Sequence, residues 1–444
     1  MENQEMMEKG SFKNLFLKMC IPTIIIMLVM VIYNMTDTFF IGKTNDPYKI
    51  AAISLCAPIF SILSGLGTLL GSGGCTVVAV SLGEKNFDKI KHITSFCFYG
   101  ALVLGLLFCV GLNINLDKIS MLIGADADTL GYASSYLRII AIGSPIIMFT
   151  NIFMNLIRAD GAATQSMIAN LLGTVVNVVL DPIFILVFHM DVAGAAIATV
   201  IGNIVSAIYI LYYVVKKQKQ FSLSFKDFTL KKDIVLPVLT LGLPLACSTI
   251  LMSCSSMMMN NVLVSYGSIV VAANGVASKV NMVISMVAMG ICMGLQPAVS
   301  FSFGAKNNKR MYHILKNMGI LTVVLGSVLT AICFIFKNQF VCAFIKNEEV
   351  VSIAVTMLMA SLISGPVYGL YQLETTFLQS TQNAKASTFL SLLNKGIVYI
   401  PVMYALNAVF GLHGVFFTVP VTDITSLIIG AIICVVWKKK VDKA

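Results

Sequence analysis

The chain has 444 residues, of which 58% are hydrophobic and only 11% are charged. A soluble domain carries about 25% charged residues and roughly 45 to 50% apolar residues, so this composition excludes an ordinary water-soluble protein. The formal net charge of +10 does not indicate a nucleic-acid partner, because the basic residues lie in short loops between apolar runs, where they set membrane topology.

Six apolar segments long enough to cross a bilayer occupy the first half of the chain. A helix needs roughly 20 apolar residues to span about 30 Å of hydrocarbon. The segments lie at 16–41, 50–81, 92–115, 131–157, 164–188 and 192–215. We interpret the first as a mature helix, because it is too long for a signal peptide and has no small-residue cleavage site before Lys43.

A polar stretch at 216–233 contains six lysines and separates the two halves of the chain. Six further apolar segments follow at 234–264, 268–303, 314–336, 350–379, 386–410 and 412–437. We therefore predict an all-α polytopic membrane protein with about 12 transmembrane helices. The predicted domains are an N-lobe at 1–215, a cytoplasmic linker at 216–233 and a C-lobe at 234–444.

The basic residues predict the orientation of these helices, because loops rich in lysine and arginine stay in the cytoplasm. Most of the 30 basic residues fall on one side if the N-terminus is inside. Trp437, the only tryptophan, directly precedes a lysine cluster, as an interfacial anchor would. We expect both termini to be cytoplasmic.

The two halves are related in sequence. A shift of 221 residues superposes Gly73 on Gly294, Gly83 on Gly304 and Lys85 on Lys306, and a shift of 220 superposes Gly194 on Gly414. Each half has an even number of spans, so the repeats share one orientation and are related by a pseudo-two-fold axis along the membrane normal. Repeats of this kind place a binding site between the lobes and permit alternating access.

Four acidic residues fall inside apolar segments, where a charge costs about 2.5 to 3.5 kcal/mol on insertion scales. Asp37 lies in the first span and Asp181 in the fifth. Asn177 is four residues before Asp181 and shares its helix face, so the three side chains predict a polar patch that holds a proton or a sodium ion. Alternatively, Asp37 lies near the outer interface and Asp181 caps a helix end. For Glu374 and Asp423, structural and functional roles remain equally open.

Other polar or flexible residues inside the spans have two interpretations each. Arg138, Lys279 and Lys395 can snorkel to the interface or pair with acids. A methionine-rich face in the eighth span suits promiscuous binding of apolar ligands or simple helix packing. The candidate substrate cavity comprises Met258, Met282, Met286, Met289, Gln296 and Glu374.

Two prolines, Pro22 and Pro244, occupy near-equivalent places in the two halves. Each removes a backbone hydrogen bond from its helix and provides a site for a bend. The 11 cysteines show no metal-ligand spacing, and we interpret them as small core residues. No metal site is certain from the sequence, although sodium is a candidate at Asp37, Asn177 and Asp181.

Motifs for ATP hydrolysis and enzyme catalysis are absent. The sequence has no GxxxxGK[ST] loop, no HExxH and no GxSxG, so neither an ATP-driven pump nor an enzyme is supported. We expect no cofactor and no obligate protein partner. A non-transporting membrane receptor or scaffold does not explain paired intramembrane acids in repeated lobes.

Several stretches resemble the multidrug and toxic compound extrusion (MATE) family, in particular its prokaryotic multidrug branch. The resemblance covers essentially the whole chain and is specific in combination. The matching stretches are 21–22 (IP), 33–42 (YNMTDTFFIG), 82–85 (LGEK), 158–161 (RADG), 177–184 (NVVLDPIF), 194–199 (GAAIAT), 294–297 (GLQP) and 303–306 (FGAK).

The resemblance implies a V-shaped pair of six-helix lobes in a prokaryotic inner or plasma membrane. It implies efflux of lipophilic organic cations in exchange for protons or sodium. By motif it nominates Asp37, Asn177, Asp181 and Thr199 for an N-lobe cation site, with Tyr33 and Asn34 in the same motif and Pro22 as the bend of the first helix. Sodium-type members carry C-lobe acids on the seventh and tenth spans, whereas here only Glu374 on the tenth span remains.

We expect a secondary active antiporter in which protonation of the Asp37 and Asp181 patch drives release of a lipophilic cation. The alternative within transport is a flippase for a lipid-linked saccharide from the same superfamily. A flippase would line its cavity with more arginine and lysine to hold pyrophosphate, and the intramembrane basic residues here are few.

Overall fold

The computed structural model describes residues 2–42, 46–345 and 347–442, and its regular structure within these ranges is helical. Within these ranges, eleven helices are long and apolar enough to cross a membrane, or twelve if the pair Glu348–Leu362 and Gly365–Ser380, bent by 45°, forms one span. These helices confirm the all-α prediction and the predicted number of spans.

The elements of the first half begin with a short helix that the hydropathy pattern did not predict. They are α1 (Glu2–Lys9), α2 (Phe12–Leu15), the π-helix η1 (Phe16–Cys20), α3 (Ile21–Gly42), α4 (Pro47–Gly83), α5 (Phe87–Ile114), α6 (Leu116–Leu122), α7 (Leu130–Ala159), α8 (Ala163–Pro182), the π-helix η2 (Ile183–Val187) and α9 (Asp191–Lys217).

A short 3-10 helix, η3 (Phe225–Asp227), interrupts the polar stretch between the halves. The second half contains α10 (Lys232–Val264), α11 (Ser268–Gly304), α12 (Asn308–Ile335), α13 (Lys337–Phe344), α14 (Glu348–Leu362), α15 (Gly365–Ser380), α16 (Ala384–Leu392), the π-helix η4 (Leu393–Ile397), α17 (Tyr399–Phe416) and α18 (Thr418–Val441).

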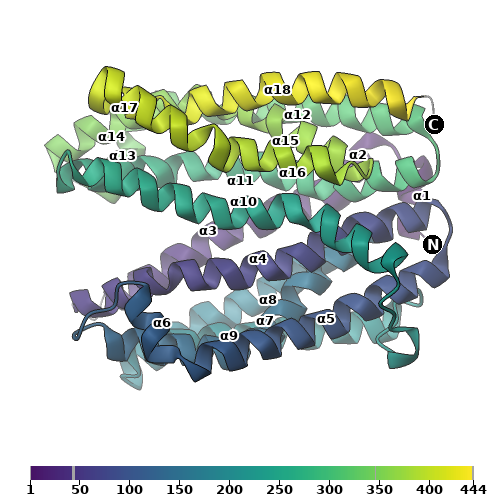
Figure 1. Ribbon diagram of the computed structural model, residues 1–444, viewed down its shortest axis with the longest axis horizontal. Helices are drawn as coiled ribbons and strands as arrows, with labels where there is room; N and C mark the ends of the chain where they lie inside the picture. Colours follow the sequence, from purple (N-terminus) through teal and green to yellow (C-terminus); the bar gives the residue numbers. More distant parts are fainter. Residues whose placement is uncertain (1, 43–45, 346, 443–444) are drawn as a thin grey trace.

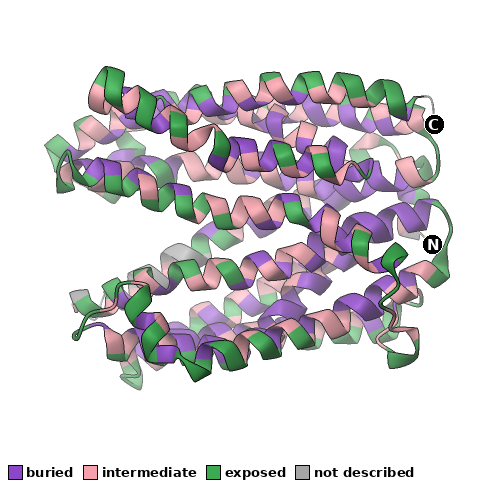
Figure 2. Cartoon of the chain, viewed as in Figure 1, coloured by how far each residue is buried: buried purple, intermediate pink, exposed green. Residues whose placement is uncertain are grey.

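The helices up to α9 and the helices from α10 onward form two groups that lie side by side (Figure 1). We call them the N-lobe and the C-lobe. The lobes lie closest at the end of the molecule that carries both termini, here named the closed end, and diverge toward the opposite, open end. Buried residues gather where the lobes meet near the closed end (Figure 2).

Glycines let α4 approach the C-lobe at backbone distance. A Cβ added at Gly73 would lie 1.8 Å from the carbonyl oxygen of Val238 in α10, and one added at Gly304 in α11 would lie 2.1 Å from that of Val80. Real Cβ atoms do not come this close to a backbone oxygen, so only glycine permits these contacts. The contact between the lobes therefore depends on glycines of both.

Two buried glutamines add hydrogen bonds across the same contact. Gln296 in α11 donates from Nε2 to Thr76 Oγ1 at 3.1 Å, and Gln379 in α15 donates to Ser72 Oγ at 2.9 Å. Both acceptors lie on α4 of the N-lobe. Polar groups buried among apolar helices form strong links only when they are paired, and these pairs fix the register between the lobes.

The bend site at Pro22 is accommodated by the surrounding helices. Proline has no N–H, so the helical donor to the Lys18 carbonyl is missing. The hydroxyl of Thr164 in α8 donates to this carbonyl at 3.5 Å. The π-helix η1 ends at Cys20, two residues before Pro22, and π-turns of this kind often mark functional sites.

The close contact at Gly242 in α10 predicts opposite effects for two alanine substitutions. A Cβ there would lie 1.8 Å from the Leu69 carbonyl oxygen, whereas one at exposed Gly275 in α11 meets nothing within 4 Å. We expect Gly242→Ala to destabilise the protein by about 1–3 kcal/mol through overpacking, and Gly275→Ala to stabilise it by roughly 0.5–1 kcal/mol through helix propensity.

Melting temperatures of the two purified variants in one detergent measure this difference. Equal shifts in the same direction would contradict the assignment of the Gly242 contact as the tighter one.

Candidate functional site

A buried polar cluster in the N-lobe joins α8 and α9. Asn177 donates from Nδ2 toward Asp181 Oδ1 and toward Thr199 Oγ1, each at 3.5 Å. The three side chains are 2%, 0% and 3% exposed, respectively. A carboxylate withdrawn this far from water within an apolar helix bundle is a default candidate for binding an ion or a proton.

Close helix packing holds the cluster together. A Cβ added at Gly173 in α8 would lie 2.1 Å from Ser206 Oγ and 2.7 Å from the Gly202 carbonyl oxygen of α9. The Ser206 hydroxyl donates to the carbonyl of Ala169 at 2.8 Å. These small residues bring α8 and α9 together, so that Asn177 reaches Thr199 across the interface.

The helix that carries Asp181 changes its geometry directly after the carboxylate. Pro182 ends α8, and η2 follows with a hydrogen bond from the N–H of Phe188 to the carbonyl of Ile183 at 2.9 Å. Proline removes one helical donor, and the wider π-turn shifts the register of the following side chains. The carboxylate thus lies at an irregular and deformable point of the span.

The first span passes the same cluster. Ile41 of α3 packs with Ile185 of η2 and Ala195 of α9 in a small apolar core. Asp37 is one turn before Ile41, and Asp181 is one turn before Ile185, so the α3 backbone at Asp37 lies near the level of Asp181. The side chains of Tyr33, Asn34 and Asp37 lie outside the described part of the structure.

A second buried polar cluster lies in the C-lobe. Asn394 of η4 donates from Nδ2 to Asp423 Oδ1 at 2.9 Å and to Ser426 Oγ at 3.2 Å. Lys395, the next residue, places Nζ 5.1 Å from the ring centroid of Tyr368. Asp423 is 3% exposed, and the lysine supplies a positive charge in its surroundings.

The residues of the predicted substrate cavity occupy different environments. Glu374 in α15 is half-buried, and its Oε2 lies 2.0 Å from a Cβ added at Gly430 of α18. Gln296 is buried in the contact between the lobes. The methionines at 258, 282, 286 and 289 are all half-buried, so they lie outside the closely packed core of their helices.

Within the described ranges, no three His, Cys, Asp or Glu side chains gather closely enough to hold a metal ion. The N-lobe cluster nevertheless offers carboxylate, amide and hydroxyl groups, which are the donor types for a proton or a small hard cation.

Sequence reasoning missed Asn394, which hydrogen-bonds the C-lobe carboxylate. A shift of 221 places it on Gly173, and a shift of 220 places Asp423 on Asn203 and Ser426 on Ser206. Comparison of the two repeats at these positions could have identified the cluster. The small residue Gly173 of the first half corresponds to the polar Asn394 of the second, and Asn203 corresponds to the acidic Asp423.

Comparisons with known proteins find relatives that match most of the chain. A family model described as MatE matches residues 22–183 and 244–405. The multidrug export protein MepA of Staphylococcus saprophyticus is 31% identical over 427 residues, covering 96% of this chain and 92% of that protein. MepA of Staphylococcus aureus is 30% identical over 416 residues, covering 94% and 92%.

Solved structures share the fold. A MATE protein in complex with MaL6 matches with a TM-score of 0.95 at 22% identity and covers 100% of both chains. A multidrug resistance MATE family transporter of the MOP superfamily, in an outward-facing conformation, matches with a TM-score of 0.93 at 22% identity and covers 99% of this chain and 98% of that one.

The hydrogen bond between Asn394 and Asp423 predicts a stability change that a swap should partly reverse. Asn394→Ala leaves a buried carboxylate oxygen without its amide donor, which costs about 1–3 kcal/mol. The double variant Asn394→Asp with Asp423→Asn restores an amide and carboxylate pair with the partners exchanged. Melting temperatures of Asn394→Asp alone, Asp423→Asn alone and the double variant measure the coupling, and strictly additive effects would contradict it.

Proposed function

Because this chain belongs to the MatE family of membrane transporters, we propose that it is a secondary active multidrug exporter, which moves lipophilic organic cations out of a prokaryotic cell in exchange for protons. The curated relatives named as multidrug export proteins match it over more than nine-tenths of its length. The sequence contains no nucleotide-binding loop, which supports an ion gradient as the source of energy.

The closed end faces the cytoplasm in this proposal. It carries both termini, and the lysine-rich linker and the lysine-rich end of α18 lie there as well (Figure 1). Positively charged loops are retained inside. The open end then faces the outside, and the two lobes alternate between opening to the outside and opening to the cytoplasm.

The observation that carries the proposal is the buried N-lobe cluster of Asn177, Asp181 and Thr199. An ionised Asp181 accepts a hydrogen bond from Asn177, and a proton arriving from the open end neutralises the carboxylate. A buried charge is expensive in hydrocarbon, so neutralisation permits the surrounding helices to repack. Repacking at the deformable turn formed by Pro182 and η2 is coupled to release of the drug cation.

The orientation of the Asn177 side chain favours a proton over sodium as the coupling ion. The amide nitrogen of Asn177 faces both Asp181 and Thr199, whereas a sodium ion at that point would need the amide oxygen. Sodium remains the alternative ion at Asp37, Asn177 and Asp181.

The C-lobe cluster is the weaker candidate for coupling. Asp423 already has the amide of Asn394 as a donor and the positive charge of Lys395 in its surroundings. A carboxylate compensated in this way has less need of a proton or a metal ion. We therefore propose a structural role for Asp423, and we keep Glu374 as a candidate residue of the substrate cavity.

Transport into sealed vesicles tests the coupling ion directly. The purified protein is reconstituted, and a fluorescent organic cation is followed while a pH gradient or a sodium gradient is imposed separately. We expect the pH gradient alone to drive transport. If only the sodium gradient drives transport, sodium is the coupling ion in place of the proton. If neither gradient drives transport of the cation but the protein transports a lipid-linked saccharide, the result favours a flippase.

Two single substitutions then test the N-lobe site. In Asp181→Asn and Asp37→Asn variants we expect the initial rate of pH-driven transport to fall at least about ten-fold, equivalent to about 1.4 kcal/mol in the transport barrier. Asp88→Asn is the matched control, because the Asp88 side chain is 87% exposed at the start of α5. If Asp181→Asn and Asp37→Asn, at equal expression, transported as fast as Asp88→Asn and the unsubstituted protein, this site would be excluded.

A further inference from the structure

Arg310 of the C-lobe hydrogen-bonds the first helix of the chain, α1. Arg310 near the start of α12 donates from Nε to the carbonyl of Met7 at 2.5 Å, and from Nη2 to those of Met6 and Gly10 at 3.1 and 2.9 Å. The last carbonyls of a helix lack helical donors and carry a partial negative charge. The guanidinium therefore caps the C-terminal end of α1.

The other end of α1 is attached to the N-lobe. Gln4 donates from Nε2 to Asp160 Oδ1 at 3.3 Å and to Gln220 Oε1 at 3.0 Å. Asp160 lies between α7 and α8, is 7% exposed, and also accepts a hydrogen bond from Gln218 at 2.7 Å. Its acceptor oxygens are thus shared between α1 and the linker.

Apolar contacts cover the middle of α1. Met6 and Met7 are 8% and 0% exposed and belong to the main apolar core. The Met7 side chain lies 3.6 Å from a Cβ built at Gly161, which follows Asp160 and has a φ of +79°. A helix of only eight residues is too short to be stable alone in water, so its packing against both lobes maintains it.

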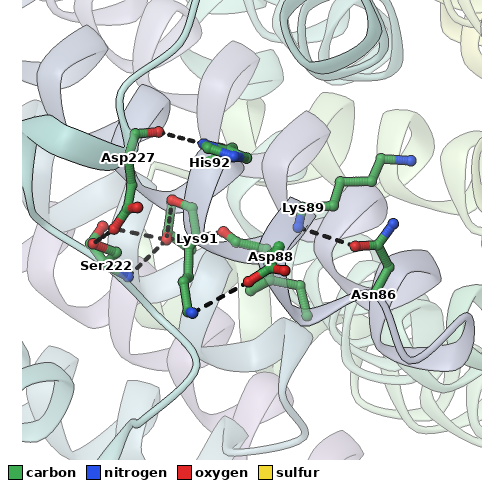
Figure 3. A network of polar contacts seen from close by, with 9 residues as sticks. Asn86, Asp88, Lys89, Lys91, His92, Ser222 and Asp227 are labelled. Carbon is green, nitrogen blue, oxygen red and sulfur yellow. Dashed lines mark hydrogen bonds and ion pairs between the residues drawn. The ribbon is translucent and has the colours of Figure 1, made fainter.

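The linker between the lobes does not make an equivalent bridge. It is fixed to α5 of the N-lobe, where His92 Nδ1 lies 2.7 Å from the Asp227 carbonyl oxygen and Ser95 donates to the Ser224 carbonyl at 2.8 Å. Figure 3 shows His92, Ser222 and Asp227 in this network. The linker therefore moves with the N-lobe, whereas α1 has polar contacts with both lobes.

We propose that α1 is a strap that holds the two lobes together at the closed end, and that Arg310 is the residue that fastens it. Opening of the closed end separates Asp160 from Arg310, which lie on different lobes, so α1 must leave at least one of them. This inference rests on the proposed alternating access of the lobes and goes beyond it, because it names the contact that must break in each cycle.

Two matched substitutions on α12 separate the strap from general charge effects. Arg310→Gln removes the cap of α1, and Lys309→Gln removes one positive charge from the exposed neighbouring residue. Spin labels on Asp88→Cys in the N-lobe and Lys316→Cys in the C-lobe report the distance between the lobes at the closed end. The background replaces the partly or fully exposed cysteines, which are Cys109, Cys247, Cys254, Cys342 and Cys434.

We expect Arg310→Gln to raise the ratio of the open to the closed population about ten-fold, equivalent to about 1.4 kcal/mol, and Lys309→Gln to leave it unchanged. Deletion of residues 2–9 should raise the ratio at least as far. The distances are measured by pulsed electron resonance in lipid nanodiscs without substrate. Identical distance distributions for Arg310→Gln, Lys309→Gln and the unsubstituted chain would overturn the strap.

Dye transport distinguishes a failure of the strap from a failure of the proposed function. If Asp181→Asn abolishes pH-driven transport while the distances in Arg310→Gln remain unchanged, the exporter stands and the strap is wrong. If the unsubstituted protein transports no cation under either gradient while Arg310→Gln still opens the closed end, the strap stands and the proposed transport is wrong.

Discussion

The close approach of α4 to the helices of the C-lobe determines how the rest of the molecule is arranged. In α4, the glycine at 73 fits against α10, and its repeat partner Gly294 in α11 fits against the start of the first span, where a Cβ would lie 2.9 Å from the Met19 carbonyl oxygen. In the absence of a hydrophobic force between helices in lipid, small residues of this kind allow the close van der Waals packing that holds membrane helices together. Gly73 and Gly294 occupy equivalent positions in the two repeats, so the same close glycine packing occurs on both sides of the interface.

The sequence predicts the number of spans because the bilayer leaves few options. A segment surrounded by hydrocarbon must satisfy its own backbone hydrogen bonds, so a long apolar run becomes a helix. This argument carries no information on α1, whose mean hydropathy is low and whose order comes from Arg310 and Met7. Nor does it predict the break in the tenth span, which is the turn at Ile363 and Ser364 between α14 and α15.

The candidate site was predictable in part for a similar reason. Asn177 and Asp181 are four residues apart on one helix, so their proximity follows from helical geometry alone. Their approach to Thr199 depends on the contact of Gly173 with α9, which no single-helix argument provides. The π-helix η2 cannot be predicted from the sequence without the tertiary structure, because its sequence, IFILV, is equally compatible with a regular α-helix.

The differences between the repeats bear on which lobe performs the ion chemistry. Where the N-lobe packs α8 on α9 through glycine and serine, the C-lobe connects η4 and α18 through Asn394, Asp423 and Ser426. A polar link with a fixed geometry makes that helix pair resistant to separation. Both clusters adjoin a π-helix, η2 in the N-lobe and η4 in the C-lobe. In the N-lobe, however, Pro182 directly follows the carboxylate of Asp181, so a change of charge there lies at a point where the helix path can change. In the exchange proposed above, an N-lobe that deforms on protonation would move against a C-lobe that stays rigid, and this division of roles would account for the unequal chemistry of two otherwise repeated halves.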